Sequence, residues 1–143
     1  MTLHTLLVLH AAPTLLLTGL IWVVQIAHYP SFADIGAADF VTYERRYTAR
    51  VGRVVLPLML AELMLTGWLW WAAPPELAPW PLVGAALLAV VWASTFLLQV
   101  PCHTILSQRA DRDAMRRLVR GNWLRTVAWT LRAAIAVALL LGS

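Results

Sequence analysis

The sequence predicts an all-α integral membrane protein, a four-helix bundle with up-down-up-down topology. Of its 143 residues, 61% are hydrophobic, and its mean hydropathy of +0.72 is far above that of soluble proteins. Four apolar runs each approach the ~20 residues that cross a bilayer. All eleven basic residues are arginines, and most of them gather in two clusters between these runs. Together these features exclude a soluble enzyme.

The four spans are expected at about residues 3–27, 51–71, 81–100 and 123–141. They leave no room for a separate soluble domain, so residues 1–143 are expected to form one transmembrane domain. The second helix is expected to begin near Phe40 and the fourth near Asp111, beyond the apolar runs. The first run lacks a basic segment before it and a small-residue cleavage site after it, so it is expected to be a retained helix.

The arginine clusters predict the orientation. Residues 45–53 follow the first span and residues 109–125 follow the third. Because short cytoplasmic loops are enriched in arginine and lysine, both clusters are expected inside, with the two termini and loop 73–80 outside a bacterial inner membrane. Contact with anionic membrane lipid accounts for the positive charge, so no nucleic-acid partner is expected.

Polar side chains fall on one line of each span. His10 and His28 are eighteen residues apart, as are Glu44 and Glu62, and this spacing places each pair on the same side of its helix. Intramembrane polar groups usually face the protein interior. The remaining polar positions are Gln25, Gln99, His103, Asn122, Arg125 and Arg132. The sequence therefore predicts a polar bundle interior.

Glu62 and Arg132 form the deeper of two expected polar layers. Each lies about ten residues from the outer end of its helix, or roughly 15 Å deep at 1.5 Å per residue. An ion pair is the least costly arrangement for both, with His10 able to hydrogen-bond to either. A proton-handling or substrate role and a purely structural pair remain equal alternatives.

The second layer is expected near the cytoplasmic membrane face, below Tyr43 and Tyr47. His28 and His103 could bind a transition metal or a haem iron, with Glu44 as a further ligand. The alternative is that these histidines cap helix ends and meet lipid headgroups. Further cofactor-binding candidates are Gln25, Gln99, Tyr47 and His10.

Arg125 and Asn122 are the candidates for substrate contact in this layer. A guanidinium and an amide offer several directed donors, which could orient a quinone-like or porphyrin-like ring. Alternatively, they could cap the fourth helix and pair with Glu44. Catalytic roles are thus predicted for Arg125, Asn122, Glu62 and Arg132.

The leading hypothesis is a membrane-embedded cofactor- or metal-binding protein, with redox activity on a lipophilic small molecule. One alternative is a transporter or channel with a proton or ion relay through His10, Glu62 and Arg132. Another is a structural subunit of a homo-oligomer or larger membrane complex. The apolar turns between His10 and Gln25 favour a local site over a continuous conduit.

Each half of the chain contains an apolar helix, a glutamine and histidine, an arginine-rich segment and a second apolar helix. This pattern predicts two parallel helical-hairpin repeats.

His10, the span ending in His28-Tyr29-Pro30 and the four-helix size resemble the small membrane protoporphyrinogen oxidases and related copper-resistance membrane proteins. That resemblance covers the first helix only, and the intramembrane lysine of the oxidases has no counterpart here. The run 122–126 is similar to a family motif of small bacterial membrane proteins. The resemblance implies a small bacterial-type membrane bundle.

Overall fold

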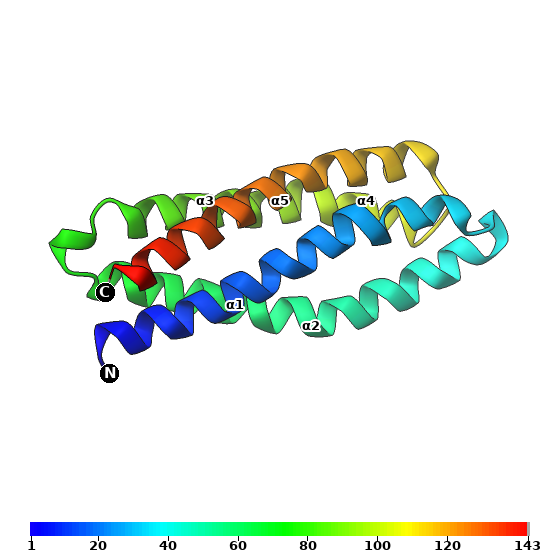
Figure 1. Cartoon of the computed structure of the whole chain (residues 1–143). Helices are drawn as coiled ribbons and strands as arrows, with labels where there is room; N and C mark the ends of the chain where they lie inside the picture. Colours follow the sequence, from blue (N-terminus) through cyan, green and yellow to red (C-terminus); the bar gives the residue numbers. More distant parts are fainter. Residues whose placement is uncertain (143) are drawn as a thin grey trace.

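The computed structural model describes residues 1–142, which form an elongated antiparallel bundle without strands (Figure 1). In the first hairpin, α1 (Leu3–Val23) continues into the π-helical segment η1 (Val24–His28). A short 3-10 turn, η2 (Pro30–Asp34), reverses the chain into α2 (Ala37–Ala72). Pro57 lies inside α2 without interrupting it.

The second hairpin begins after the 3-10 turn η3 (Pro75–Leu77). Helix α3 (Trp80–Ser94) continues through the π-helical segment η4 (Thr95–Gln99) into α4 (Val100–Leu106). Helix α5 (Arg112–Leu141) completes the bundle. The all-α, four-helix prediction is confirmed, as are the early starts of the second and fourth helices.

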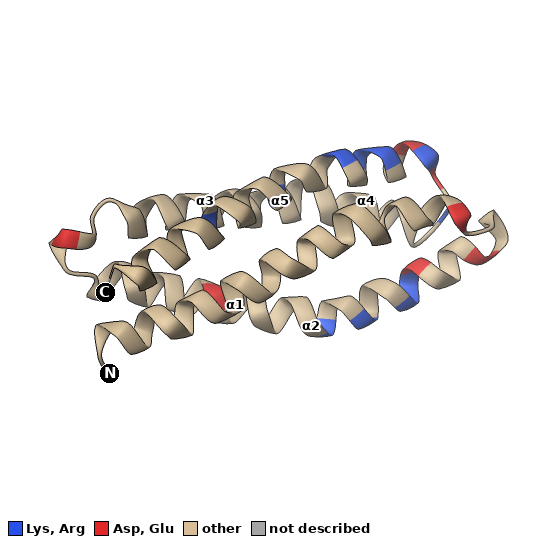
Figure 2. Ribbon diagram, in the orientation of Figure 1, with Lys and Arg blue, Asp and Glu red and all other residues tan. Residues whose placement is uncertain are grey.

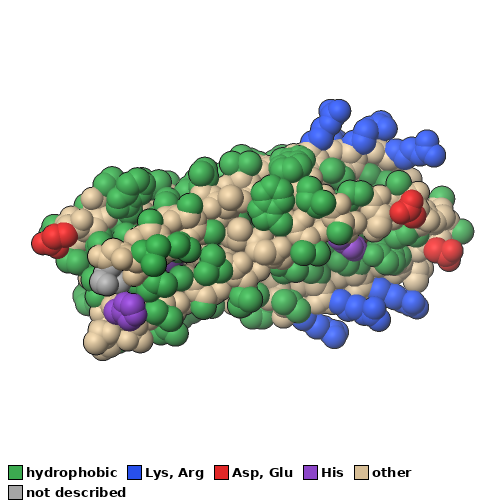
Figure 3. Space-filling model, viewed as in Figure 1, with side chains coloured by type: hydrophobic (Ala, Val, Ile, Leu, Met, Phe, Trp, Pro, Cys, Tyr) green, Lys and Arg blue, Asp and Glu red, His purple; other side chains and the backbone are tan. Residues whose placement is uncertain are grey.

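Four continuous helical stretches are long and apolar enough to span a membrane, which indicates an integral membrane protein. They are Leu3–Asp34, Ala37–Ala72, Trp80–Leu106 and Arg112–Leu141. The two termini lie at one end of the bundle (Figure 1), and the arginine clusters lie toward the other (Figure 2). On the visible face, apolar side chains cover the length of the bundle and arginines project at one end (Figure 3).

Local chemistry explains where the helices begin and end. The Thr2 side chain accepts a hydrogen bond from the backbone N–H of Thr5 at the start of α1. At the start of α5, Asp111 accepts from the backbone N–H groups of Asp113 and Ala114. Such caps satisfy donors that have no partner within the helix. Helix α2 ends just before the Pro74-Pro75 pair, which cannot continue a helix.

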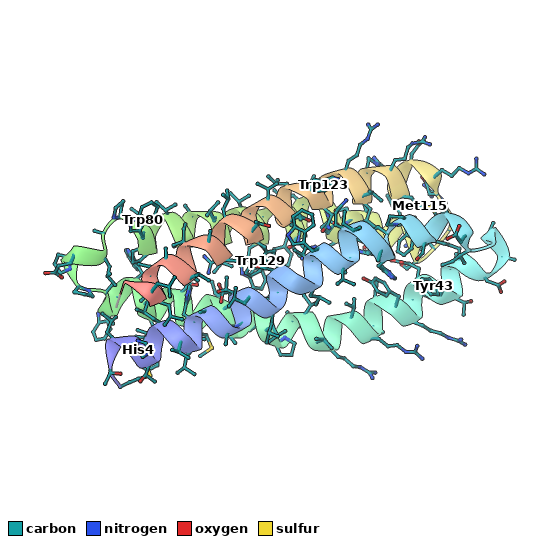
Figure 4. The ribbon with its side chains drawn as sticks, in the orientation of Figure 1. His4, Tyr43, Trp80, Met115, Trp123 and Trp129 are labelled. Carbon is teal, nitrogen blue, oxygen red and sulfur yellow. The ribbon has the colours of Figure 1, made fainter. Side chains whose placement is uncertain are left out.

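The interior is filled by three apolar layers along the bundle axis. The layer near the termini contains Leu6, Leu7, Leu69 and Leu139. The middle layer contains Leu17, Ile21, Met59, Leu88, Val91, Ala128 and Trp129. The layer at the arginine-rich end includes Phe32, Phe40, Leu106 and Leu118. Trp129 lies in the middle of the bundle, whereas Trp80 and Tyr43 lie toward opposite ends (Figure 4). The buried polar residues lie between these layers.

Candidate functional site

The deep polar cluster is centred on Glu62 of α2 and Arg132 of α5, and the prediction that they pair is confirmed. Arg132 Nη2 donates to Glu62 Oε1, and Nη1 donates to the carbonyl of Gly84. Both side chains are at most 1% exposed. Burial of either charge alone would be costly, and the ion pair offsets the cost of burying both side chains within the bundle.

Helix α1 and the next turn of α2 complete the deep cluster. The Thr14 hydroxyl lies 2.7 Å from Glu62 Oε1, and Arg132 Nη2 donates to Thr66 Oγ1 at 2.9 Å. His10 Nε2 lies 3.3 Å from Arg132 Nη2. Because a guanidinium can only donate, Nε2 is the acceptor in this contact. The expected contact of His10 with this pair is therefore present.

The second polar cluster contains a carboxylate–histidine dyad. His103 Nδ1 of α4 lies 2.5 Å from Glu44 Oε1 of α2, and Glu44 is fully buried. Because an ionised carboxylate can only accept, Nδ1–H donates to Glu44. This bond fixes the orientation of the imidazole, and Nε2 remains for a second hydrogen bond. The hydroxyl of Tyr29 lies 3.5 Å from this nitrogen.

Asn122 and Arg125 of α5 lie beside the dyad, next to the two glutamines. Asn122 Nδ2 donates to Gln25 Oε1 at 2.8 Å, and Arg125 Nη1 donates to Asn122 Oδ1 at 3.3 Å. Gln99 lies against Gly121, where an added Cβ would be 3.2 Å from Gln99 Nε2. The missing side chain of Gly121 thus gives Gln99 its place beside α5.

Both glutamines are carried by π-helical turns. Gln25 belongs to η1 and Gln99 to η4, which occupy corresponding positions in the two hairpins. A π turn holds one residue more than an α turn, so it changes which side chains face the interior beyond it. The shared feature agrees with the expected parallel hairpin repeats.

A cavity of about 380 Å³ lies beside this second cluster. Apolar side chains of α1, η1, α2, α4 and α5 form most of its wall. Tyr29, Gln99, His103 and Arg125 provide polar groups in the lining. Val100 and Thr104 are exposed and also line it, so the cavity opens to the bundle surface between α2 and α4. Its volume is in the range of small-molecule sites.

The described residues give no support to a metal centre. Among residues 1–142, no group of three or more His, Cys, Asp or Glu side chains could hold a metal ion. His28 stacks on Tyr47 with ring centroids 3.7 Å apart, whereas His103 is bonded to Glu44 and lines the cavity. The proposed ligand set of His28, His103 and Glu44 therefore gains no support, because its histidines serve different contacts.

Tyr29 and Gly84 contribute to these clusters but were not predicted from the sequence. Tyr29 adjoins His28, and a phenol at the end of an apolar run could have marked it as a site residue. Gly84 contributes only its carbonyl, so no side-chain pattern could identify it. No known family model, curated protein or solved structure matches this chain.

Proposed function

We propose that this chain binds a lipophilic small molecule in the cavity between α2 and η4–α4, with the polar head of that molecule toward Arg125. One observation carries the proposal. Arg125 Nε and both amide atoms of Gln99 are buried without a hydrogen-bond partner, and both residues line the cavity. Buried polar atoms are costly unless they are hydrogen-bonded. The polar head of such a ligand can form hydrogen bonds with Arg125 and Gln99, and its apolar body can contact the apolar wall of the cavity.

His103 gives the cavity acid–base chemistry. The Nδ1–H group of His103 is hydrogen-bonded to Glu44, so Nε2 can accept a proton from a bound molecule or return one. The side chains lining the cavity support proton transfer as the chemistry of the site. Redox activity and haem binding stay predictions from the sequence.

The cavity lies in the half of the bundle that carries the arginine clusters. The positive-inside tendency favours the cytoplasmic side for this half. We therefore place the proposed site in the cytoplasmic leaflet, where a lipophilic molecule can enter sideways from the membrane.

A proton or ion conduit is the weaker alternative. The middle apolar layer, including Leu88, Val91 and the buried Trp129, lies between the deep polar cluster and the second polar cluster. A conduit needs polar groups from face to face, and this layer interrupts them. The deep polar cluster then serves as a structural ion pair.

Photolabelling with a long-chain alcohol that carries a diazirine tests the proposal. The protein is placed in phosphatidylcholine nanodiscs, irradiated and mapped by mass spectrometry. Labelling is expected at Val51 and Val55, which line the cavity. Gly52→Phe should abolish it, because Gly52 lines the cavity and nothing lies within 4 Å of an added Cβ.

Gly19→Phe is the matched control. This glycine also has nothing within 4 Å of an added Cβ, and it is exposed on α1 outside the cavity lining. Labelling should persist in this variant. Equal labelling of the parent and Gly52→Phe would overturn the proposed cavity.

A further inference from the structure

The bundle contains two buried arginines and two buried acidic residues among residues 1–142, but they do not form two ion pairs. Arg132 pairs with Glu62. Glu44 is instead bonded to His103. Arg125 is only 9% exposed and has no carboxylate within 4.0 Å in the part of the chain that the structure describes. Among the described residues, the Arg125 guanidinium therefore has no carboxylate partner, whereas Arg132, deeper in the bundle, has Glu62.

An unpaired guanidinium at this position requires compensation. The described hydrogen bond of Arg125 goes to Asn122 Oδ1, a neutral amide oxygen, at 3.3 Å. Its Nε has no partner. A charge removed from water is stable only when it is paired and hydrogen-bonded, and an anion beside the guanidinium would provide both. Since Arg125 lines the cavity, that anion can be supplied by the bound molecule.

We infer that the ligand is a long-chain carboxylic acid, bound as its carboxylate to Arg125. This inference rests on the proposed function and specifies the ligand class for the same cavity. A carboxylate offers two oxygens, which match the fork of a guanidinium. A single negative charge balances Arg125, whereas a phosphate dianion would bring excess charge into a largely apolar space.

Gln99 and the apolar wall complete the recognition of such a molecule. The amide N–H groups of Gln99 can donate to a carboxylate oxygen beside Arg125, and the amide is otherwise without a partner. Leu17, Ile21 and Val55 line the cavity away from the cytoplasmic end, alongside Trp129. They can contact the hydrocarbon chain, which would then extend toward the centre of the membrane.

Competition against the diazirine alcohol tests this inference in the full-length protein. The competitors are palmitate, hexadecanol, methyl palmitate and hexadecyl phosphate, in phosphatidylcholine nanodiscs. In the parent, palmitate should compete at roughly one-tenth of the hexadecanol concentration or less, because hydrogen bonds between charged groups are the stronger class. Methyl palmitate should compete no better than hexadecanol.

Arg125→Gln should remove the preference for palmitate, and Arg125→Lys should retain part of it. Arg120→Gln is the matched control, since Arg120 is exposed on the same helix and does not line the cavity. It should leave the preference unchanged. If neither Arg125 variant folds, the ratio of palmitate to hexadecanol in the parent decides the question.

The two proposals fail in distinguishable ways. If the alcohol labels the cavity but palmitate competes no better than hexadecanol, the carboxylate is wrong and the cavity stands. A stronger competition by hexadecyl phosphate than by palmitate, or a preference that persists in Arg125→Gln, would also overturn the carboxylate assignment. If the alcohol does not label the cavity at all, the proposed function itself is wrong.

Discussion

Arg132 of α5 donates a hydrogen bond to the Glu62 carboxylate of α2 inside the bundle, although the two residues are 70 positions apart in sequence. Thr14, Thr66 and His10 surround this pair. The pair thus connects α1, α2 and α5 through one network of polar contacts. Networks of this kind favour one arrangement of helices, because any other leaves a buried charge without a partner.

Removing one member of the deep pair should cost more than removing both charges. Arg132→Ala is expected to destabilise the bundle by ~3–5 kcal/mol, because Glu62 is left uncompensated. The double variant Glu62→Gln with Arg132→Met should recover much of that loss. Thermal unfolding in detergent of the parent, the single variants and the double variant measures the coupling. Additive losses would show that the pair is not energetically coupled.

The Glu44–His103 bond should fix the tautomer of the imidazole. Nitrogen-15 NMR of the parent is expected to show the proton of neutral His103 on Nδ1, where Glu44 accepts it. Glu44→Leu should abolish this preference and lower the stability by ~1.5–3 kcal/mol, the range for hydrogen bonds to charged groups. Glu76→Gln, in the loop at the other end, is the control. An unchanged His103 spectrum in Glu44→Leu would contradict the assignment.

The start of α5 should be sensitive to acid. The backbone N–H of Ala114, with the Arg109 side chain beside it, holds the pKa of Asp111 below its ordinary value. The stabilisation is therefore fully present above the unfolded pKa of about 4 and is lost as the pH falls through the lower folded pKa. Asp111→Asn should reduce the unfolding temperature at neutral pH, and this difference should shrink in acid.

Asp34→Asn provides the control for that titration, since Asp34 is an exposed carboxylate in the turn η2, at the same end of the bundle. It should change the unfolding temperature little at either pH. A difference between Asp111→Asn and the parent that stayed constant down to about pH 2 would disprove the predicted pH dependence.

The orientation in the membrane is a prediction from the arginine clusters. In a Cys102→Ala background, Glu76→Cys should react with a membrane-impermeant thiol reagent added to the outside of intact cells. Glu76 lies in η3, at the same end as the two termini. Reaction from the cytoplasmic side only would reverse the orientation and would place the cavity in the outer leaflet.

The helices were predictable because length and apolar character decide which segments can cross a membrane. The Glu62–Arg132 pair was predictable too, since depth follows from the helical rise and burial of a single charge is costly. The early start of α2 was predictable because Glu44 and Glu62 lie on the same side of one helix when that helix continues before the apolar run. These features depend on local sequence or on one strong energetic rule.

The cavity and the division of the two histidines were not predictable. The π-helical turns η1 and η4 add a residue to a turn, so constant angular spacing misplaces side chains beyond them. His28 therefore could not be assigned to its stack on Tyr47. The space between α2 and α4 depends on how side chains of several helices pack, which no single-helix pattern describes.

Locating a bound lipophile directly tests the central claim. Crystals grown in a lipid phase with a long-chain alcohol brominated at its hydroxyl end would reveal the bromine by anomalous scattering. We expect the bromine between α2 and η4–α4, close to Arg125 and Gln99. Bromine found only on the outer bundle surface, such as the groove beside Gly67 and Trp70, would contradict the account.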